Sequence, residues 1–281
     1  MRLSHITFLL VNGSKKHMKY TAKNFHLHYI PQYKLLIKTG FIEDTLVVLD
    51  ENNEIQVLHS YPSNLPDSEA TKLLGLPFQK VFITVALQGL VFIPTEVYNE
   101  NDSSLYQQFL PDDKISRTHK INIESIDVTG CYQFDLLAHN KWKVIFPTAK
   151  FIPNFCMVLQ QAQAHIPLQG EVFGLHMNDN QVELFAFKNG KFQFYQIFDV
   201  HNKNDLNYFI LNACKSIGIS PKMDKILVSG LASDHQYIPL LEGFSTNLVF
   251  IKPTVKIQSE NSEVQEKLNP LNVLIDSQIC A

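Results

Sequence analysis

The sequence has little of what marks several common classes of protein. It contains four cysteines, Cys131, Cys156, Cys214 and Cys280, and no two of them stand at a CxxC or other zinc-ligand spacing. This usage is typical of buried thiols in a reducing cytosol. The 24 lysines and arginines are outnumbered by 27 acidic residues, so the net charge of −3 gives no chain-wide attraction for nucleic acid. The Walker A, GxGxxG, HExxH and GxSxG motifs are absent, which disfavours the enzymes that carry them.

Long hydrophobic runs are absent as well. A membrane-spanning helix needs about 20 consecutive apolar residues, and no stretch of the sequence approaches that length. The apolar run at residues 6–11 is too short for the core of a secretory signal, and no small-residue cleavage site follows it. We therefore predict a cytoplasmic protein without membrane insertion. Met18 is an alternative start to Met1, because the ordered pattern begins only near Phe25.

The sequence does contain a repeated pattern. Residues 34–61 and 171–198 align without a gap at a constant offset of 137 residues. Each copy has three apolar runs separated by polar turns, which predicts a three-stranded antiparallel meander in each. Helix and strand patterns then alternate after each meander. The predicted elements are 68–76 and 80–87 in the first copy, and 204–217, 225–230, 237–241 and 247–251 in the second. Ser68 is the candidate N-cap of the first helix, and Gly218 stands where the C-cap of the helix over 204–217 belongs.

The repeat divides the chain into four parts. These are an N-terminal extension (1–24), a first lobe with inserted strands (25–166), a second lobe (167–253) and a C-terminal tail (254–281). Within the insertion, the pattern predicts alternating strands over 119–139 and a helix over 154–166. The start of the tail is polar and is predicted to be loose. Residues 268–279 are apolar enough to dock, and we expect them to form an edge element.

Three antiparallel strands followed by α-β-α-β form the ribonuclease-H-like unit. Two such units in tandem resemble the actin-like ATPase architecture of actin, hexokinases, Hsp70 chaperones and the pilus-assembly protein PilM. More closely, the chain resembles a bacterial family found chiefly in Bacteroidetes, domain of unknown function 3822. The resemblance spans about residues 33–253 and rests on VFIPTEVYNENDSSLYQQFL (91–110), FPTAKFIPNFCMVLQ (146–160) and the segment 187–221. It implies a two-lobed α/β fold of the actin-like ATPase type, without an established reaction.

The actin-like resemblance also implies where a nucleotide would bind. In such ATPases the nucleotide lies between the lobes, an Asp at the end of each unit's first strand organises Mg²⁺, and turn amides cradle the phosphates. The sequence has Lys38-Thr39-Gly40 at this place in the first unit and Leu175 at the same offset in the second, so both acids are missing. Asp44 and Asp179 lie nearby as displaced metal carboxylates or, alternatively, as ordinary turn residues.

The adenosine loop of these enzymes is the third landmark, and it usually has two adjacent glycines. The matching segment SGLASD (229–234) has one, which also suits a plain turn from a strand into a helix capped by Ser233 or Asp234. We expect neither a metal site nor a catalytic residue. The candidate nucleotide-binding residues, in the cleft between the lobes, are Lys38, Thr39, Gly40, Gly230 and Ser233.

The run FQFYQIF (192–198) has apolar residues on both of its faces. This pattern favours packing on both sides, with a partner surface as the alternative. Together with the missing acids, it predicts a degenerate actin-like protein that acts without catalysis as an interaction or scaffold protein, as PilM-type relatives of the fold can, with no cofactor and an unknown protein partner. The alternative is a nucleotide-binding ATPase or kinase-like enzyme that uses ATP and Mg²⁺ through displaced carboxylates. A nucleic-acid binder is disfavoured by the acidic balance and by the lack of a DEDD-like carboxylate set.

Overall fold

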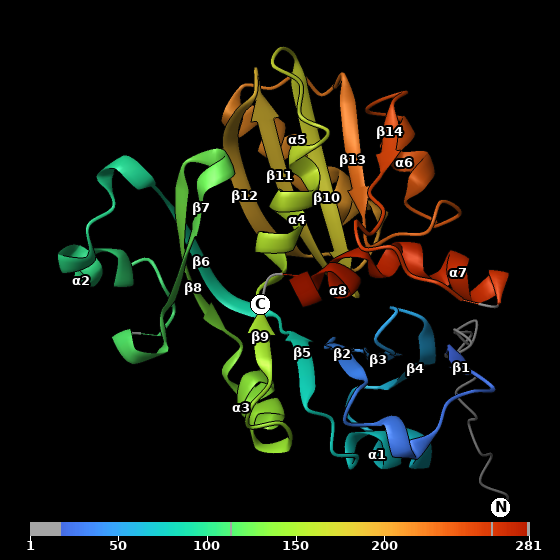
Figure 1. Ribbon diagram of the computed structural model, residues 1–281. Coiled ribbons are helices and arrows are strands. Elements are labelled where there is room, and N and C mark those ends of the chain that lie inside the picture. Colours follow the sequence, from blue (N-terminus) through green and yellow to red (C-terminus); the bar gives the residue numbers. More distant parts are fainter. Residues whose placement is uncertain (1–17, 113, 260, 280–281) are drawn as a thin grey trace, which may run out of the picture.

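The computed structural model describes residues 18–112, 114–259 and 261–279 (Figure 1). The predictions about the run 6–11 and a start at Met1 lie outside these ranges. The first lobe is built on a six-stranded sheet in the order β1-β4-β3-β2-β5-β9. Its strands are β1 (Lys19–Thr21), β2 (Lys34–Lys38), β3 (Glu43–Leu49), β4 (Ile55–Pro62), β5 (Lys80–Thr84) and β9 (Lys150–Ile152).

The second lobe is built on a five-stranded sheet in the order β12-β11-β10-β13-β14. Its strands are β10 (Glu171–Asn178), β11 (Gln181–Lys188), β12 (Lys191–Asp199), β13 (Lys225–Ser229) and β14 (Leu248–Phe250). Apart from β1, the two sheets have the same strand order. In each, an antiparallel meander is extended by two strands parallel to its first strand. The predicted α/β fold of tandem ribonuclease-H-like units is therefore confirmed.

A third, three-stranded antiparallel sheet is inserted in the first lobe, in the order β6-β8-β7. It comprises β6 (Leu87–Pro94), β7 (His119–Ile123) and β8 (Val128–Phe134), with the short helix α2 (Ser103–Gln107) between β6 and β7. Strand structure was expected to continue to His139, but it ends at Phe134. Asp135 begins a helix there because its carboxylate accepts the amide of Ala138 at 2.8 Å.

The remaining elements are helices that cover the two main sheets. They are α1 (Ser68–Leu74), α3 (Leu136–Ile145), α4 (Asn154–Gln163), α5 (Lys203–Ile217), α6 (Ile238–Glu242), α7 (Ser262–Leu268) and α8 (Asn272–Asp276). Short 3-10 turns occur at Leu27–Tyr29, Thr95–Val97, Glu100–Asp102, Ile115–Arg117, Glu124–Ile126, Asn269–Leu271 and Ser277–Ile279. Within the described ranges, no helix combines the length and the apolarity needed to cross a bilayer.

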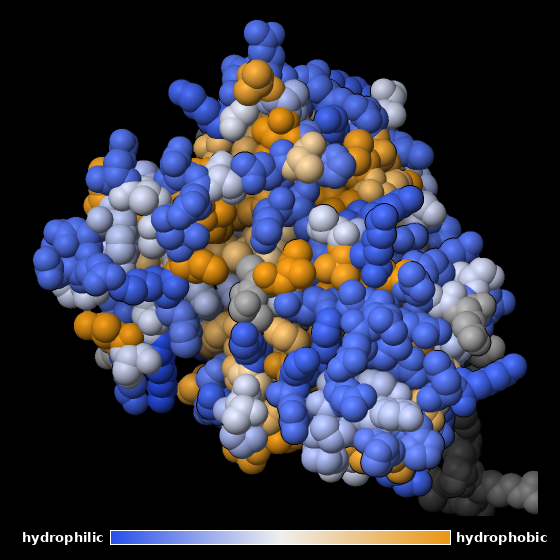
Figure 2. Space-filling model, in the orientation of Figure 1, coloured by the Kyte–Doolittle hydropathy of each residue, from blue (hydrophilic) through white to orange (hydrophobic). Residues whose placement is uncertain are grey.

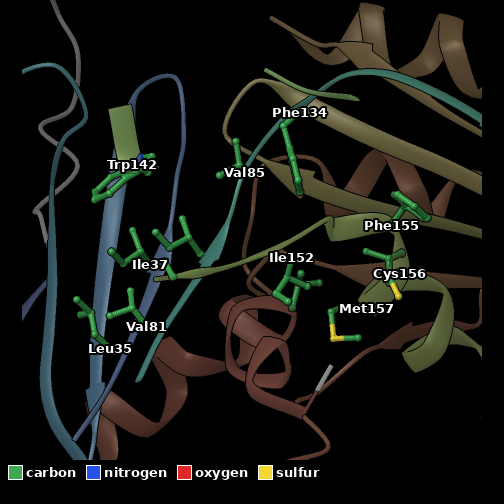
Figure 3. Packing of buried hydrophobic residues seen from close by; sticks show 14 of the residues in the cluster. Leu35, Ile37, Val81, Val85, Phe134, Trp142, Ile152, Phe155, Cys156 and Met157 are labelled. Atoms are coloured by element: carbon green, nitrogen blue, oxygen red, sulfur yellow. The ribbon is translucent and has the colours of Figure 1, made fainter. Parts of the chain in front are cut away.

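The last helices of the two lobes are exchanged. Helix α4 follows β9 of the first lobe, yet its Phe155 and Val158 pack with Val172 and Phe185 of the second-lobe sheet. Figure 1 shows α4 lying across that sheet. This cluster is continuous with the first-lobe core, and Figure 3 shows it running from Leu35 and Val81 to Phe155 and Met157. In return, α7 and α8 from the end of the chain cover the first-lobe sheet.

Alternation along β2 shows how this second covering works. Successive residues of a strand point to opposite faces of its sheet. Leu35 and Ile37 therefore lie in the cluster that contains α1 and α3, while Leu36 packs with Leu274 and Ile275 of α8. The expected edge element in the C-terminal tail is therefore wrong. These residues are a helical layer over a sheet face, and the tail is ordered into helix from Ser262.

Two local expectations near the ends of helices differ in outcome. Gly218 is the left-handed C-cap of α5 with φ 65°, as its position predicts. The cap of α1 is Asp67 rather than Ser68, because the Asp67 carboxylate accepts the amides of Glu69 and Ala70. At the N-terminus, Lys19–Thr21 of the predicted extension pairs with β4, so order begins before Phe25.

The packing of α8 makes a prediction. Ile275 is fully buried against the first-lobe sheet, whereas Ile279 in the next turn is 51% exposed. Ile275→Ala should lower the free energy of unfolding by about 2–5 kcal/mol, through lost burial and the cavity left behind. Urea denaturation measures this, with Ile279→Ala as the control that should change stability by less than about 0.5 kcal/mol. Equal effects would show that the C-terminal helix does not belong to the core.

Candidate functional site: the facing turns of the two lobes

In the two units, the parallel pairing of the first strand ends at a lysine and at a histidine. Lys38 is the last residue of β2 to pair with β5, and His176 is the last residue of β10 to pair with β13. The equivalent of Lys38 is therefore His176 and not Leu175. The offset between paired residues of the two units is one residue longer than the offset of the sequence alignment. Leu175 points into the second-lobe core. Neither of these two positions supplies a carboxylate.

His176 is a neutral imidazole in this setting. Burial, and then the charge of Lys38, lower the pKa of His176 from 6.5 to about 3. Its Nδ1 lies 2.8 Å from the hydroxyl of Ser229 at the end of β13. The two residues where the fold's ATPases carry Mg²⁺-organising acids are thus a cation and a buried uncharged ring, and neither supplies the oxygen ligand that Mg²⁺ prefers.

The hairpin turns that follow these strands are bound to each other by Asp179. Its carboxylate Oδ2, from the β10–β11 turn, accepts the amide of Ile42 at 3.0 Å in the β2–β3 turn and that of Glu43 at 3.3 Å at the start of β3. Two backbone amides that converge on one anionic oxygen form the arrangement by which turns hold phosphate oxygens. In this protein an internal carboxylate fills it.

The contact of Asp179 with the amides of Ile42 and Glu43 is called the turn lock below. Thr39 and Gly40, both predicted nucleotide contacts, take part in it. Gly40 has no room for a side chain, because an added Cβ would lie 2.1 Å from Asp179 Oδ2. Thr39 is buried, its hydroxyl donates to the carbonyl of Thr84 at 2.9 Å, and its own carbonyl accepts the side-chain amide of Asn178 at 3.3 Å. Both residues therefore hold the two turns together.

Asp44, the other displaced carboxylate, is buried beneath the first turn. It accepts the amide of Gly40 at 3.1 Å, and Lys141 of α3 lies 3.3 Å from its other oxygen. Burial raises the pKa of Asp44, while the Gly40 amide and Lys141 act in the opposite direction. Its oxygens are thus directed at the turn and at α3. Across the described part of the chain, no group of three or more His, Cys, Asp or Glu side chains could hold a metal ion.

A cavity of about 470 Å³ lies between the lobes beside these turns. It brings together two of the predicted contacts, Lys38 and Gly230, whereas Ser233 lines a neighbouring cavity. The charged side chains around the first cavity are Glu43, Asp234, Glu263, Glu266, Lys38 and Lys267. Four acids against two lysines make a poor environment for a polyphosphate. Ser233 is exposed and does not cap α6, whose N-cap is Tyr237.

Gly230 contacts a buried network of polar side chains. Its φ is 76°, and an added Cβ would lie 2.1 Å from the carbonyl oxygen of Met177, so only glycine fits. Its amide is 3.4 Å from Asn272 Oδ1, and Asn272 Nδ2 donates to Ser229 at 2.8 Å and to Gln161 at 2.6 Å. The network thus connects the Gly230 turn to the exchanged helices α4 and α8.

A second buried group lies where α4 meets the second-lobe sheet. Glu183 of β11 accepts Asn154 Nδ2 at 3.1 Å and the hydroxyl of Tyr195. Burial raises the pKa of Glu183 to about 7, although both hydrogen bonds act in the opposite direction. No pattern in the sequence marks this acid, because it stands among the apolar residues of a strand as a solvent-facing residue would.

These features define a member of the actin-like ATPase fold in which the facing turns are joined by side chains. The chain matches the family described as "Protein of unknown function (DUF3822)" over residues 22–248, and it belongs to that family. The predicted family membership is therefore confirmed. A comparison with curated proteins finds no match.

Two solved structures are similar to this one over most of their length. A protein of unknown function with an actin-like ATPase fold from Bacteroides thetaiotaomicron VPI-5482 is 15% identical, with a TM-score of 0.61, and the match covers 87% of this chain and 98% of that one. PilM, in a PilM–PilN type IV pilus biogenesis complex, is 13% identical, with a TM-score of 0.57 and coverage of 88% and 97%. At these identities the likeness shows the fold.

The turn lock makes a stability prediction. Asp179→Gly removes the acceptor of two amides, and glycine tolerates the φ of 53° at this position without strain. The free energy of unfolding should fall by about 1–3 kcal/mol. Asp179→Asn keeps an oxygen acceptor and a residue type that also adopts this conformation, so it should lose less. Chemical denaturation compares the three proteins, and equal stability of Asp179→Gly and wild type would refute the lock.

Glu183 makes a prediction about pH. Its folded pKa of about 7 exceeds the unfolded value of 4.5, so the folded state binds the proton more tightly. The stability it contributes is present below pH 4.5 and is lost as the pH rises through 7. Glu183→Gln cannot ionise, so the stability of wild type relative to this variant should fall by about 3 kcal/mol across that window. Denaturation at a series of pH values tests this, and parallel curves would contradict it.

Proposed function

We infer that this protein is a non-catalytic member of the actin-like fold that acts in the cytoplasm by holding another protein. The observation that carries this proposal is the Asp179 carboxylate on the amides of Ile42 and Glu43. An incoming phosphate would have to displace a covalently tethered anion from those amides. It would also have to approach a cavity in which acids outnumber lysines.

The end positions of the first strands support the same proposal. Phosphoryl transfer depends on a divalent cation that neutralises the developing charge, and carboxylates normally hold that cation or its water. Lys38 and His176 stand where such acids are expected, and Asp44 and Asp179 are engaged with backbone amides. The PilM–PilN neighbour adds a precedent of the same fold in a complex with a second protein.

The rival function is a nucleotide-binding enzyme that uses displaced carboxylates. One observation favours it, namely that Lys38 and Gly230 from opposite lobes line one cavity large enough for part of a nucleotide. Lys38 could contact a phosphate as a point charge in such a site. ATP and Mg²⁺ are the cofactors of this rival alone.

Thermal unfolding with Mg-ATP separates the two functions. A ligand stabilises a protein by RT ln(1 + [L]/Kd), so wild type should show no shift in Tm at millimolar Mg-ATP and no turnover above background. Asp179→Gly should acquire a rise in Tm with inorganic phosphate, because the variant frees the amides of Ile42 and Glu43. Stabilisation of wild type by Mg-ATP, with turnover that Asp44→Asn abolishes in a folded protein, would establish the enzyme instead.

A further inference from the structure

An open groove separates the inserted sheet from the second lobe. A cavity of about 280 Å³ lies between β6 and β12, lined by residues 87–90 of the former and 195–199 of the latter. Successive residues of a strand point to opposite faces, so a cavity lined by consecutive residues faces the edge of the strand. Both β6 and β12 are the outermost strands of their sheets. The groove therefore lies between two strand edges, and Figure 2 shows apolar atoms on the surface between the two sheets.

The register shows which main-chain groups face the groove. Val200 donates its amide to the carbonyl of Asn180. In an antiparallel pair every second residue bonds to the neighbouring strand, so Val200 and the residues at even steps from it bond to β11. The amide of Ile197, at an odd step, is directed away from β11. On the other wall, Thr95 donates to the carbonyl of Asp127, and the same alternation directs the amide of Leu90 away from β8. In the described part of the chain, no strand pairs with either outer edge.

The groove is closed at one end and charged at the other. Phe92 of β6 fills the gap beyond Tyr195, with its ring centroid 5.7 Å from that of Tyr195 and 5.3 Å from that of Phe192. Asp199 stands at the opposite end and is the single charged residue in the lining. The rest of the lining is apolar or carries side-chain amides, so the groove has no cationic side chain that would favour a phosphate.

We propose that this groove binds an extended peptide segment of a partner protein, which adds as a strand between β6 and β12 and places a lysine or arginine at Asp199. This proposal rests on the proposed function and names the chemistry of its partner. An extended backbone satisfies two facing strand edges, because its N–H and C=O groups project to both sides. The five lining residues of β12 span about 17 Å, which matches a segment of about five residues.

Selection of a random 12-residue peptide library displayed on phage, with the full chain as bait, provides the probe. The selected peptides should share alternating apolar residues and a basic residue at one end. Synthetic, fluorescently labelled versions should bind in fluorescence anisotropy. Hydrogen exchange should show protection by the peptide at residues 87–90 and 195–199.

Proline variants test the strand-edge contact directly. Ile197→Pro and Leu90→Pro each remove an outward amide while sparing the pairing within the sheet, and edge strands tolerate this change. Each should weaken peptide binding at least tenfold. The matched controls Ile197→Thr and Leu90→Val keep the amide and should bind within twofold of wild type. Asp199→Lys, at an exposed position, should disfavour the basic peptides whether or not a proline variant folds.

Three outcomes would overturn the proposal. They are a selection that yields no binding peptide, binding that survives both proline variants, and protection of β12 that appears without peptide in a dimer detected by light scattering. The last outcome would make a second copy of the chain the occupant. Failure of this kind leaves the proposed non-catalytic role standing, because that role falls only if wild type binds Mg-ATP and turns it over.

Discussion

The exchange of the last helices between the two sheets is the constraint on which the rest of the structure depends. Helix α4 leaves the first lobe to cover the second sheet, and α8 leaves the second lobe to cover the first. Where they meet, Gln161 donates to Asp276 at 2.5 Å and accepts from Asn272 at 2.6 Å. All three side chains are buried, so a partner removed from any of them would leave an unsatisfied polar group in the interior. The hydrogen bonds between α4 and α8 thereby join the two lobes to each other.

The contact between α4 and α8 also positions residues on one side of the cleft between the lobes. Asn272 reaches from α8 to Ser229 and the Gly230 turn, and Ser229 lies against His176 at the end of β10. On the opposite side, Asp179 and the β2–β3 turn close the same cleft. An actin-like ATPase needs a cleft that a nucleotide can enter and leave. In this protein, internal hydrogen bonds link the turns on both sides of the cleft. Side chains, above all those of Asp179 and Asn272, thus join these turns.

Periodicity was enough to predict the two meanders and the strands that follow them, because these elements leave a two-residue alternation and fully apolar runs in the sequence. The two-lobed architecture came from the resemblance to actin-like proteins. Gly218 could also be predicted as a cap, because a glycine directly after a helical pattern favours the left-handed conformation that ends a helix. The tail was misjudged because a short amphipathic helix and an edge strand look alike over a few residues, and only the sheet it covers distinguishes them. The roles of Asp179 and Asn272 could not be predicted, because each bonds to a turn far away in the sequence. The one-residue slip between Lys38 and His176 likewise needs strand pairing to be seen.

The edge strand β12 differs from the bridged cleft, because no strand of the described residues pairs with its outer edge. Nine residues long and rich in phenylalanine, it runs along the outside of the second lobe, and none of its residues is fully buried. Natural sheets guard such edges with inward charges, prolines or short strands, because an unpaired edge invites association. Here Lys191 and Asp199 stand only at the ends, and the middle carries neither a charge nor a proline. The inserted sheet guards the edge partly, since Phe92 covers one half and leaves the half above Tyr195 open. The edge is thus covered over half of its length and is lined with amides over the other half. This arrangement restricts what can pair with the edge to a short extended segment that enters from one end.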